Sequence, residues 1–229
     1  MRSSTAYVTL KGIGPFVVTA EAAAAMRESS SAAVRTLRTL ERDGLARNVR
    51  HGIWEVAERS PDPRTLAVVL TRPLPAYVSF DSALAEHGVI DEIPRRIAVA
   101  TLGEARTVPT ALGTFEFHHI PPELWTGFVR RSDEFYLASV EKAIFDTVYV
   151  ECARGRPLPR LPEIEEGTPV DRALLEDWTS RIRSARARTL VREALGHLRI
   201  QREEPAQAVG TRAPTVRTRR ASARRALPV

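Results

Sequence analysis

Residues 19–57 of this 229-residue chain read TAEAAAAMRESSSAAVRTLRTLERDGLARNVRHGIWEVA, and this stretch decides the fold of the N-terminal part. Its alanine-rich beginning predicts a short helix over residues 20–26. Thr19 is the expected N-cap of that helix, because its side-chain oxygen can accept a backbone N–H of the first turn. Residues 27–30 form a turn. The pattern therefore predicts two helices separated by a tight turn.

The second helix of this stretch is amphipathic. Ser29 or Ser30 is its expected N-cap, and Gly44 ends it. Four apolar side chains recur at helical spacing and are expected to pack on the first helix: Ala33, Val34, Leu37 and Leu40. The opposite face carries a stripe of one hydroxyl and three guanidinium groups: Ser31, Arg35, Arg38 and Arg42. Such groups can hydrogen-bond to guanine edges and to the phosphates beside them, so the stripe is a candidate DNA-binding surface.

A two-stranded hairpin is predicted after the second helix. Its strands are residues 45–49 and 53–57, and its turn is residues 50–52. It carries three further candidate DNA-binding side chains: Arg47, Arg50 and His51. A hairpin of this kind usually rests on the phosphate backbone or in the minor groove. The helices, the turn and the hairpin together predict a winged helix-turn-helix domain over residues 1–60 that binds double-stranded DNA.

The alternative interpretation is that these arginines are the solvated face of an ordinary small helical module, because runs of charge usually are solvated. The turn, the caps, the apolar spacing, the arginine stripe and the hairpin all agree with one another. This agreement favours DNA binding over the alternative.

Residues 1–18 do not show a distinct first helix. Residues 6–10 and 16–18 have the composition of extended segments, separated by Gly12, Gly14 and Pro15. This N-terminus has neither an uninterrupted hydrophobic segment nor a small-residue cleavage site, so no secretory signal is expected.

Composition indicates a cytoplasmic protein. No apolar run in the sequence approaches the length that spans a bilayer, so no membrane association is expected. The single cysteine, Cys152, allows no internal disulfide and indicates a reducing compartment. The formal net charge of +6 is divided into +3 over residues 1–60, −2 over residues 61–200 and +5 over residues 201–229. Long-range attraction to DNA would therefore come from the two ends of the chain.

Residues 61–200 are expected to form a second domain, after a boundary at the SPDP sequence of residues 60–63. The predicted elements indicate α+β packing: helices over 64–70, 79–88 and 139–152, and strands over 97–101, 114–120 and 135–138. Thr168 as cap and Pro169 in the first turn start a long helical segment from residue 170 to about residue 200. Residues 201–229 are arginine-rich and contain no aromatic side chain, so this tail is expected to be disordered.

No catalytic constellation is recognised, so we expect no enzymatic activity, no cofactor and no metal site. His118 and His119 are neighbours on a predicted strand and face opposite sides of it, which does not suit joint coordination of one metal ion. His87 is expected to pack on the apolar face of its helix, and Cys152 to be buried. Three polar residues occupy positions typical of helix caps or helix surfaces: Ser79, Glu141 and Asp146.

Three blocks of the middle region form a recognisable series: YVSFDSALAEHGVIDEIPRRIAVAT at 77–101, GTFEFHHI at 113–120 and YLASVEKAIFDTVYV at 136–150. The positions that carry the series are Ser79, Ser82, Ala83, Leu84, His87, Gly88, Ile93, Pro94, 99–101, Glu141, Lys142, Ala143 and Asp146. In order and spacing these blocks resemble the AbiEi antitoxin family of bacterial abortive-infection systems. The resemblance covers roughly residues 15–200.

This resemblance implies two activities. A winged helix would bind operator DNA upstream of its own operon and repress it, and the second domain would neutralise a cognate nucleotidyltransferase toxin encoded beside it. Whether neutralisation needs direct contact stays open, as does oligomerisation on DNA. The alternative is a one-component transcription regulator whose middle domain binds a small ligand and which has no toxin. A nucleotidyltransferase gene adjacent to this one favours the antitoxin, and its absence favours the regulator.

Overall fold

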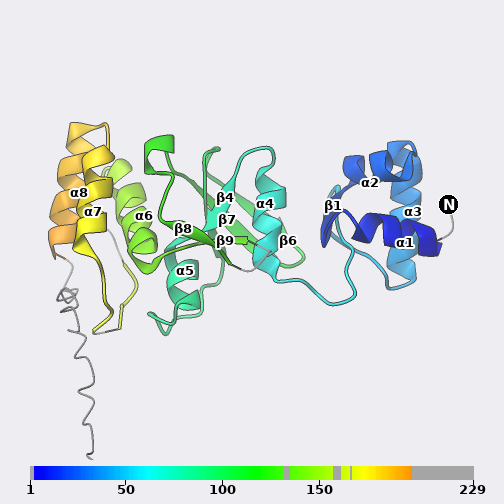
Figure 1. Ribbon diagram of the computed structural model, residues 1–229, viewed down its shortest axis with the longest axis horizontal. Helices are drawn as coiled ribbons and strands as arrows, with labels where there is room; N and C mark the ends of the chain where they lie inside the picture. The colour runs from blue at the N-terminus through cyan, green and yellow to red at the C-terminus, as the bar shows by residue number, and fades with distance from the viewer. Residues whose placement is uncertain (1–2, 132–134, 157–160, 166, 198–229) are drawn as a thin grey trace, which may run out of the picture.

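The computed structural model describes residues 3–131, 135–156, 161–165 and 167–197. Within these ranges the chain forms eight α-helices and two β-sheets, which confirms the predicted α+β class. The elements follow one another along the long axis of the molecule, with the N-terminal helices at one end and the last two helices at the other (Figure 1). The arginine-rich tail, residues 201–229, lies outside the described residues.

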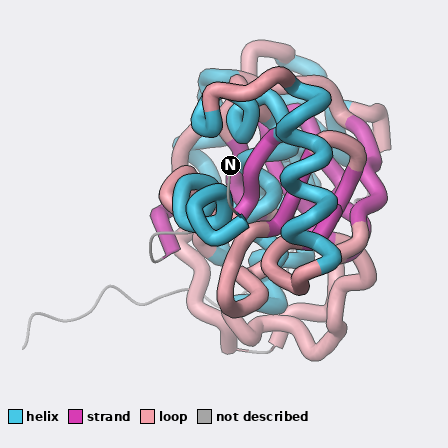
Figure 2. Tube along the Cα trace, turned by 90° about the vertical axis from the view of Figure 1, so that its right-hand side faces the viewer, coloured by secondary structure: helices cyan, strands magenta, loops and turns pink. Residues whose placement is uncertain are grey.

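The N-terminal unit, residues 3–57, contains three helices and a small sheet. The helices are α1 (Ser3–Lys11), α2 (Thr19–Met26) and α3 (Ser30–Arg42). The antiparallel sheet has the strand order β1 (Phe16–Val18), β3 (Ile53–Glu55) and β2 (Arg47–Arg50). The helices form the outer end of the molecule, and the strands lie between them and the second unit (Figures 1 and 2).

Helix α1 corrects the prediction of an extended segment at residues 6–10. Ala6 and Leu10 stand four residues apart, so they share one face of the helix. Both are fully buried against α2 and α3. The aromatic and β-branched residues between them favour a strand by intrinsic propensity, but the burial of a helical face outweighs that weak preference. The predicted strand at residues 16–18 is confirmed as β1.

Helix α3 begins and ends where the sequence predicts. Ser29 is its cap, with Oγ accepting the N–H of Ala32 at 3.3 Å. Gly44, at a φ of +73°, adopts the left-handed conformation just after the helix. The buried face consists of Ala33, Leu37 and Leu40, and Val34 is half-buried.

The predicted role of Thr19 as the cap of α2 is wrong. Val18 precedes the helix, and its N–H donates to the Glu21 carboxylate at 3.3 Å. Thr19 is the first helical residue and ties α2 to the hairpin. Its Oγ1 donates to the Gly52 carbonyl at 3.2 Å and accepts from Trp54 Nε1, also at 3.2 Å.

The second unit is built on a six-stranded mixed sheet with the order β6-β7-β5-β4-β9-β8. The strands in chain order are β4 (Ala76–Val78), β5 (Ile97–Thr101), β6 (Arg106–Thr110), β7 (Gly113–His119), β8 (Phe128–Arg131) and β9 (Phe135–Ala138). The β4–β9 and β5–β7 pairs are parallel, and the other three pairs are antiparallel. The three strands predicted from sequence in this unit are confirmed as β5, β7 and β9.

Helices cover both faces of this sheet. The elements between and beside the strands are η1 (Pro63–Thr65), α4 (Leu66–Thr71), α5 (Phe80–Glu86), η2 (Pro122–Leu124) and α6 (Val140–Ala153). Side chains alternate along β5, so Val99 packs in the core with α4, while Ala98 and Ala100 pack in the core with α5 and α6. The sheet therefore separates two apolar cores.

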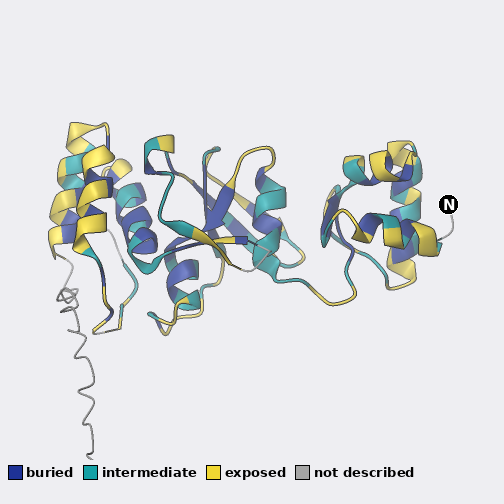
Figure 3. Ribbon diagram, in the orientation of Figure 1, coloured by how far each residue is buried: buried dark blue, intermediate teal, exposed yellow. Residues whose placement is uncertain are grey.

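The described part of the chain ends in two helices, α7 (Arg172–Arg181) and α8 (Ala185–His197). The prediction of one long helix from residue 170 is wrong. Asp171, rather than Thr168, caps α7, because its carboxylate accepts backbone N–H groups of the first turn. Ile182 then leaves the helical conformation, and Ser184 Oγ accepts an N–H of the first turn of α8 at 3.3 Å. The break lets both helices pack on α6 while their outer faces remain exposed (Figure 3).

An apolar cluster crosses the predicted boundary between the two units. Phe16 of β1 and Val49 of β2 pack with residues of α4 and of the large sheet, including Leu66 and Phe115. The N–H of Ala111, in the β6–β7 turn, donates to the Val49 carbonyl at 2.8 Å. The small sheet is thus attached to the second unit by both apolar contact and hydrogen bonding.

Candidate nucleic-acid interface

The stripe predicted on α3 is exposed along its whole length. Its four members are Ser31, Arg35, Arg38 and Arg42. Arg42 donates to Thr39 Oγ1 at 3.0 Å on the same helix. Across the described ranges, no carboxylate lies within ion-pair distance of Arg35 or Arg38. These two guanidinium groups are therefore available to acceptors outside the molecule.

The hairpin tip presents two further predicted residues, Arg50 and His51, both exposed. Gly52, at a φ of +77°, supplies the left-handed conformation that the turn requires. The Asn48 side-chain amide closes the turn from inside by donating to the carbonyls of Arg50 at 3.1 Å and Ile53 at 3.3 Å. These two hydrogen bonds stabilise the turn, and the basic side chains of the tip remain exposed.

A groove of about 400 Å³ separates α3 from the hairpin. Arg38 and Glu41 line it from the helix, and Asn48 and His51 line it from the hairpin. Glu41 Oε1 accepts the backbone N–H of Asn48 at 2.9 Å, which fixes the spacing of the two elements. The same hydrogen bond holds the Glu41 carboxylate in the groove that Arg38 and His51 also line.

Arg47 differs from the other predicted residues. It is exposed at the base of the hairpin, where its guanidinium donates to the Ala111 carbonyl at 2.9 Å and lies 3.9 Å from the Glu55 carboxylate. Its observed contacts therefore serve the joint between the units. The groove places Arg38 of the α3 stripe opposite His51 of the hairpin tip, whereas Arg47 is directed toward the second unit.

Two arginines of the second unit lie beside the hairpin tip, and no sequence pattern placed them there. Arg72 and Arg106 line a cleft of about 510 Å³ together with the tip. Arg72 pairs with Glu21 of α2. Arg106 donates to a backbone carbonyl of α4 at 2.9 Å and its guanidinium carbon lies 4.9 Å from the centre of the Phe117 ring. Only the packing of the two units brings these side chains next to Arg50 and His51.

A buried polar centre in the second unit was also missed. Ser79 and Asp146, expected as a cap and a surface residue, are fully buried, as is Lys142. Lys142 Nζ lies 2.6 Å from Asp146 Oδ1. Asp146 Oδ2 accepts hydrogen bonds from Tyr77 at 2.9 Å and from Ser79 at 2.8 Å. Every polar atom of this carboxylate is therefore paired, as burial of a charge requires.

Aromatic rings enclose the Lys142 ammonium group. Nζ lies 5.0 Å from the centre of the Phe145 ring and 5.5 Å from that of Trp178. Ring faces attract cations, and this attraction strengthens away from water. Burial, together with the Asp146 charge, raises the pKa of Tyr77 well above its usual value, so Tyr77 remains a hydrogen-bond donor.

The histidines show one prediction confirmed and one overturned. His118 and His119 do face opposite sides of β7: His118 is buried with its ring 4.4 Å from that of Phe80, and His119 is exposed. Burial lowers the pKa of His118. His87 is exposed rather than packed, with Nε2 2.8 Å from the Ala138 carbonyl. Within the described ranges, no three His, Cys, Asp or Glu side chains are arranged to hold a metal ion.

The predicted burial of Cys152 is confirmed, and burial raises the pKa of its thiol. No helix in the described part of the chain is long and apolar enough to cross a membrane. Comparison with known protein families and with curated proteins gives no match for this sequence.

Proposed function

We propose that residues 3–57 form a winged helix-turn-helix domain that binds double-stranded operator DNA. In this assignment α2 and α3 are the helix-turn-helix, α3 enters the major groove, and the β2–β3 hairpin is the wing on the phosphate backbone. The observation that supports it most is the exposed arginine stripe of α3, whose Arg38 lines the same groove as His51 of the hairpin tip.

The proposed biological role is that of a cytoplasmic transcriptional repressor and antitoxin without catalytic activity or cofactor. The antitoxin part rests on the sequence resemblance of the second unit to AbiEi proteins. Several positions of that resemblance, among them Ser79, Lys142 and Asp146, form the buried polar centre. These three side chains therefore contribute to the packing of this unit. The cognate nucleotidyltransferase remains the proposed partner, through direct or indirect contact.

One observation favours the second candidate, a one-component regulator with a ligand-binding domain. The second unit contains a cleft of about 760 Å³ beside Phe80. This volume lies within the range of small-molecule sites, roughly 300–1,000 Å³. Growth of cells that express the adjacent gene product, with this chain supplied from a foreign promoter, separates the two candidates: rescue from a toxic nucleotidyltransferase supports the antitoxin.

DNA binding is tested by titrating the full chain against a labelled duplex from upstream of its own operon and against a scrambled duplex at one salt concentration. Replacement of Arg35 or Arg38 by alanine is expected to cost about 1–3 kcal/mol of binding free energy at the operator. Arg186→Ala is the matched control, because Arg186 is equally exposed but lies on α8 at the other end of the molecule. An Arg35/Arg38 double variant with unchanged operator affinity would overturn the proposal.

A further inference from the structure

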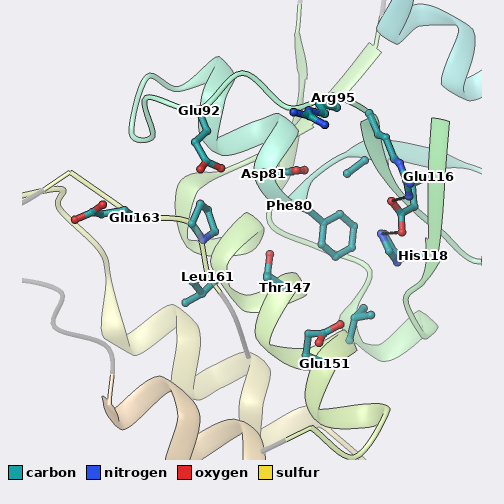
Figure 4. Close-up of a pocket in the computed structure, with 14 residues that line it drawn as sticks. Phe80, Asp81, Glu92, Arg95, Glu116, His118, Thr147, Glu151, Leu161 and Glu163 are labelled. Atoms are coloured by element: carbon teal, nitrogen blue, oxygen red, sulfur yellow. Dashed lines mark hydrogen bonds and ion pairs between the residues drawn. The ribbon is translucent and has the colours of Figure 1, made fainter. Parts of the chain in front are cut away.

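The cleft beside Phe80 lies on the α5–α6 side of the large sheet, away from the core that contacts the N-terminal unit. Its walls come from the start of α5, from β5 and β7, from α6, and from the chain segments around residues 92–96 and 161–163 (Figure 4). Segments far apart in the sequence thus converge on one cavity.

Phe80 occupies a special position in this cleft. Its φ is +58°, a left-handed conformation that a bulky side chain rarely adopts. Ser79, immediately before it, points into the buried polar centre, and the Phe80 ring packs against His118 on the cleft wall (Figure 4). The fold maintains this unfavourable backbone conformation, and the Phe80 ring lines the cleft as a result.

Carboxylates outnumber basic groups around the cavity. Five acidic residues line it, Asp81, Glu92, Glu116, Glu151 and Glu163, against two arginines. Glu116 pairs with Arg96 at 3.0 Å. Glu151 pairs with arginines at the end of α6. Throughout the described chain, by contrast, no basic side chain lies within ion-pair distance of Asp81, whose Oδ1 accepts the backbone N–H of Ser82 at 2.8 Å. A carboxylate on the cleft wall therefore lacks a counter-ion.

His118 provides an independent polar group. It is 9% exposed, and the guanidinium of Arg154, which can only donate, lies 3.4 Å from its Nδ1. This contact suits the tautomer that carries the ring proton on Nε2 and leaves Nδ1 as an acceptor. The Glu116 carboxylate lies 3.8 Å from Nε2, which is too long for a hydrogen bond. In this tautomer the Nε2 N–H lies on the cleft wall and can donate to a molecule bound in the cleft.

We propose that this cleft binds a small organic cation, an amine or guanidine, that also carries a hydrogen-bond acceptor. Asp81 pairs with the positive group, Phe80 packs against it or against the adjoining apolar stem, and His118 Nε2 donates to the acceptor. Glu92 and Glu163, both exposed at the mouth, add attraction for cations. The proposal does not depend on DNA or toxin binding, because the site lies wholly within the second unit.

The test is isothermal titration calorimetry of the full chain with two probes that carry the same guanidinium group. Argininamide has a carbonyl acceptor, whereas agmatine has none. Saturable 1:1 binding is expected for both probes, with argininamide binding more tightly. No binding of either probe up to about 1 mM, or equally strong competition by Mg²⁺, would overturn the proposal.

Three variants assign the contacts. Asp81→Asn preserves the acceptor for the Ser82 N–H and should lower the affinity for both probes at least about tenfold. Asp91→Asn, on the exposed loop after α5, is the matched control and should change neither. His118→Phe should remove the preference for argininamide and leave agmatine unaffected. If Asp81→Asn or His118→Phe fails to fold, the exposed variants Glu92→Gln and Glu163→Gln should still lower the affinity for both probes. Unchanged affinity in these variants would count against the site.

Discussion

Ser79 Oγ and Asp146 Oδ2 are joined by a 2.8 Å hydrogen bond although the two residues lie 67 positions apart in the sequence. The bond directs Ser79 into the core at the point where β4 passes into α5. Phe80, the next residue, then adopts its left-handed conformation and faces the cleft. Such a backbone conformation costs on the order of 1–3 kcal/mol, and it persists because the buried centre fixes its neighbour.

The buried Lys142–Asp146 pair should dominate the stability of the second unit. Lys142→Met leaves the Asp146 charge buried without its counter-ion, so the free energy of unfolding should fall by about 3–5 kcal/mol. Adding Asp146→Leu in the same chain should recover part of that loss. Urea unfolding of the two single variants and the double variant measures the coupling.

The exposed Arg181–Asp177 pair on α7 is the control for this cycle, because it has the same i,i+4 spacing. Its coupling energy should be at most about 0.5 kcal/mol, since exposed pairs contribute little. Equal coupling energies for the two pairs would contradict the assigned role of the buried centre.

His118 should make stability depend on pH. Burial lowers its pKa in the folded state below the usual value near 6.5, so the unfolded chain takes up the proton first as the pH falls. The free energy of unfolding should therefore decrease as the pH drops below about 6.5, and it should level off once the pH is below the folded pKa. His118→Phe should reduce this slope in urea unfolding at a series of pH values.

Thr19 should stabilise the attachment of α2 to the hairpin. Thr19→Val keeps the shape but removes both the acceptor of Trp54 Nε1 and the donor to the Gly52 carbonyl. We expect a loss of about 1–3 kcal/mol, because two partly buried polar groups lose their partner. Thr9→Val on α1, whose hydroxyl only donates to a carbonyl of its own helix, should change the unfolding midpoint much less.

Local patterns predicted the elements whose signals lie within one turn or one strand. The Ala33, Leu37 and Leu40 face of α3, its Ser29 cap and its Gly44 end follow from short-range sequence alone. The α3 stripe was placed for the same reason, since residues three and four apart share a helix face. Where propensity and tertiary burial disagree, as at Ala6 and Leu10, the sequence gives the wrong element.

Contacts between distant segments could not be predicted. Tyr77 and Asp146 belong to different elements, and each alone has the pattern of an ordinary strand or helix residue. Arg106 reaches the hairpin tip only because the two units pack together. The cleft depends on the left-handed conformation of Phe80, and phenylalanine is not a residue type from which that conformation would be predicted. In each case the deciding interaction has no local sequence signal.

Glu41 should oppose DNA binding while supporting the fold. Its carboxylate fixes Asn48 but also brings negative charge to the groove between α3 and the hairpin. Glu41→Gln keeps an acceptor for the Asn48 N–H and removes the charge, so affinity for any duplex should rise, most strongly at low salt. Glu41→Ala should lower stability as well. Duplex titrations at two salt concentrations, with urea unfolding alongside, separate the two effects, and equal or weaker binding by Glu41→Gln would contradict this role.

The second unit should be less stable when cut from the first. A fragment of residues 61–200 loses the cover that Phe16 and Val49 give to Leu66 and Phe115, together with the hydrogen bond from Ala111. In the full chain, Phe16→Ala should cost about 3–5 kcal/mol, because the ring is 2% exposed and its removal leaves a cavity at the joint.

The same joint predicts how the chain unfolds. If the apolar cluster couples the units, the full chain should unfold in one transition, and the fragment should unfold at a lower urea concentration and bind a hydrophobic dye that the full chain does not. Thr5→Ala, on the exposed surface of α1, is a control that should leave the single transition of the full chain unchanged. A fragment as stable as the intact protein, with two separate transitions in the full chain, would show that the boundary at residues 60–63 divides independent domains and that the cluster contributes little.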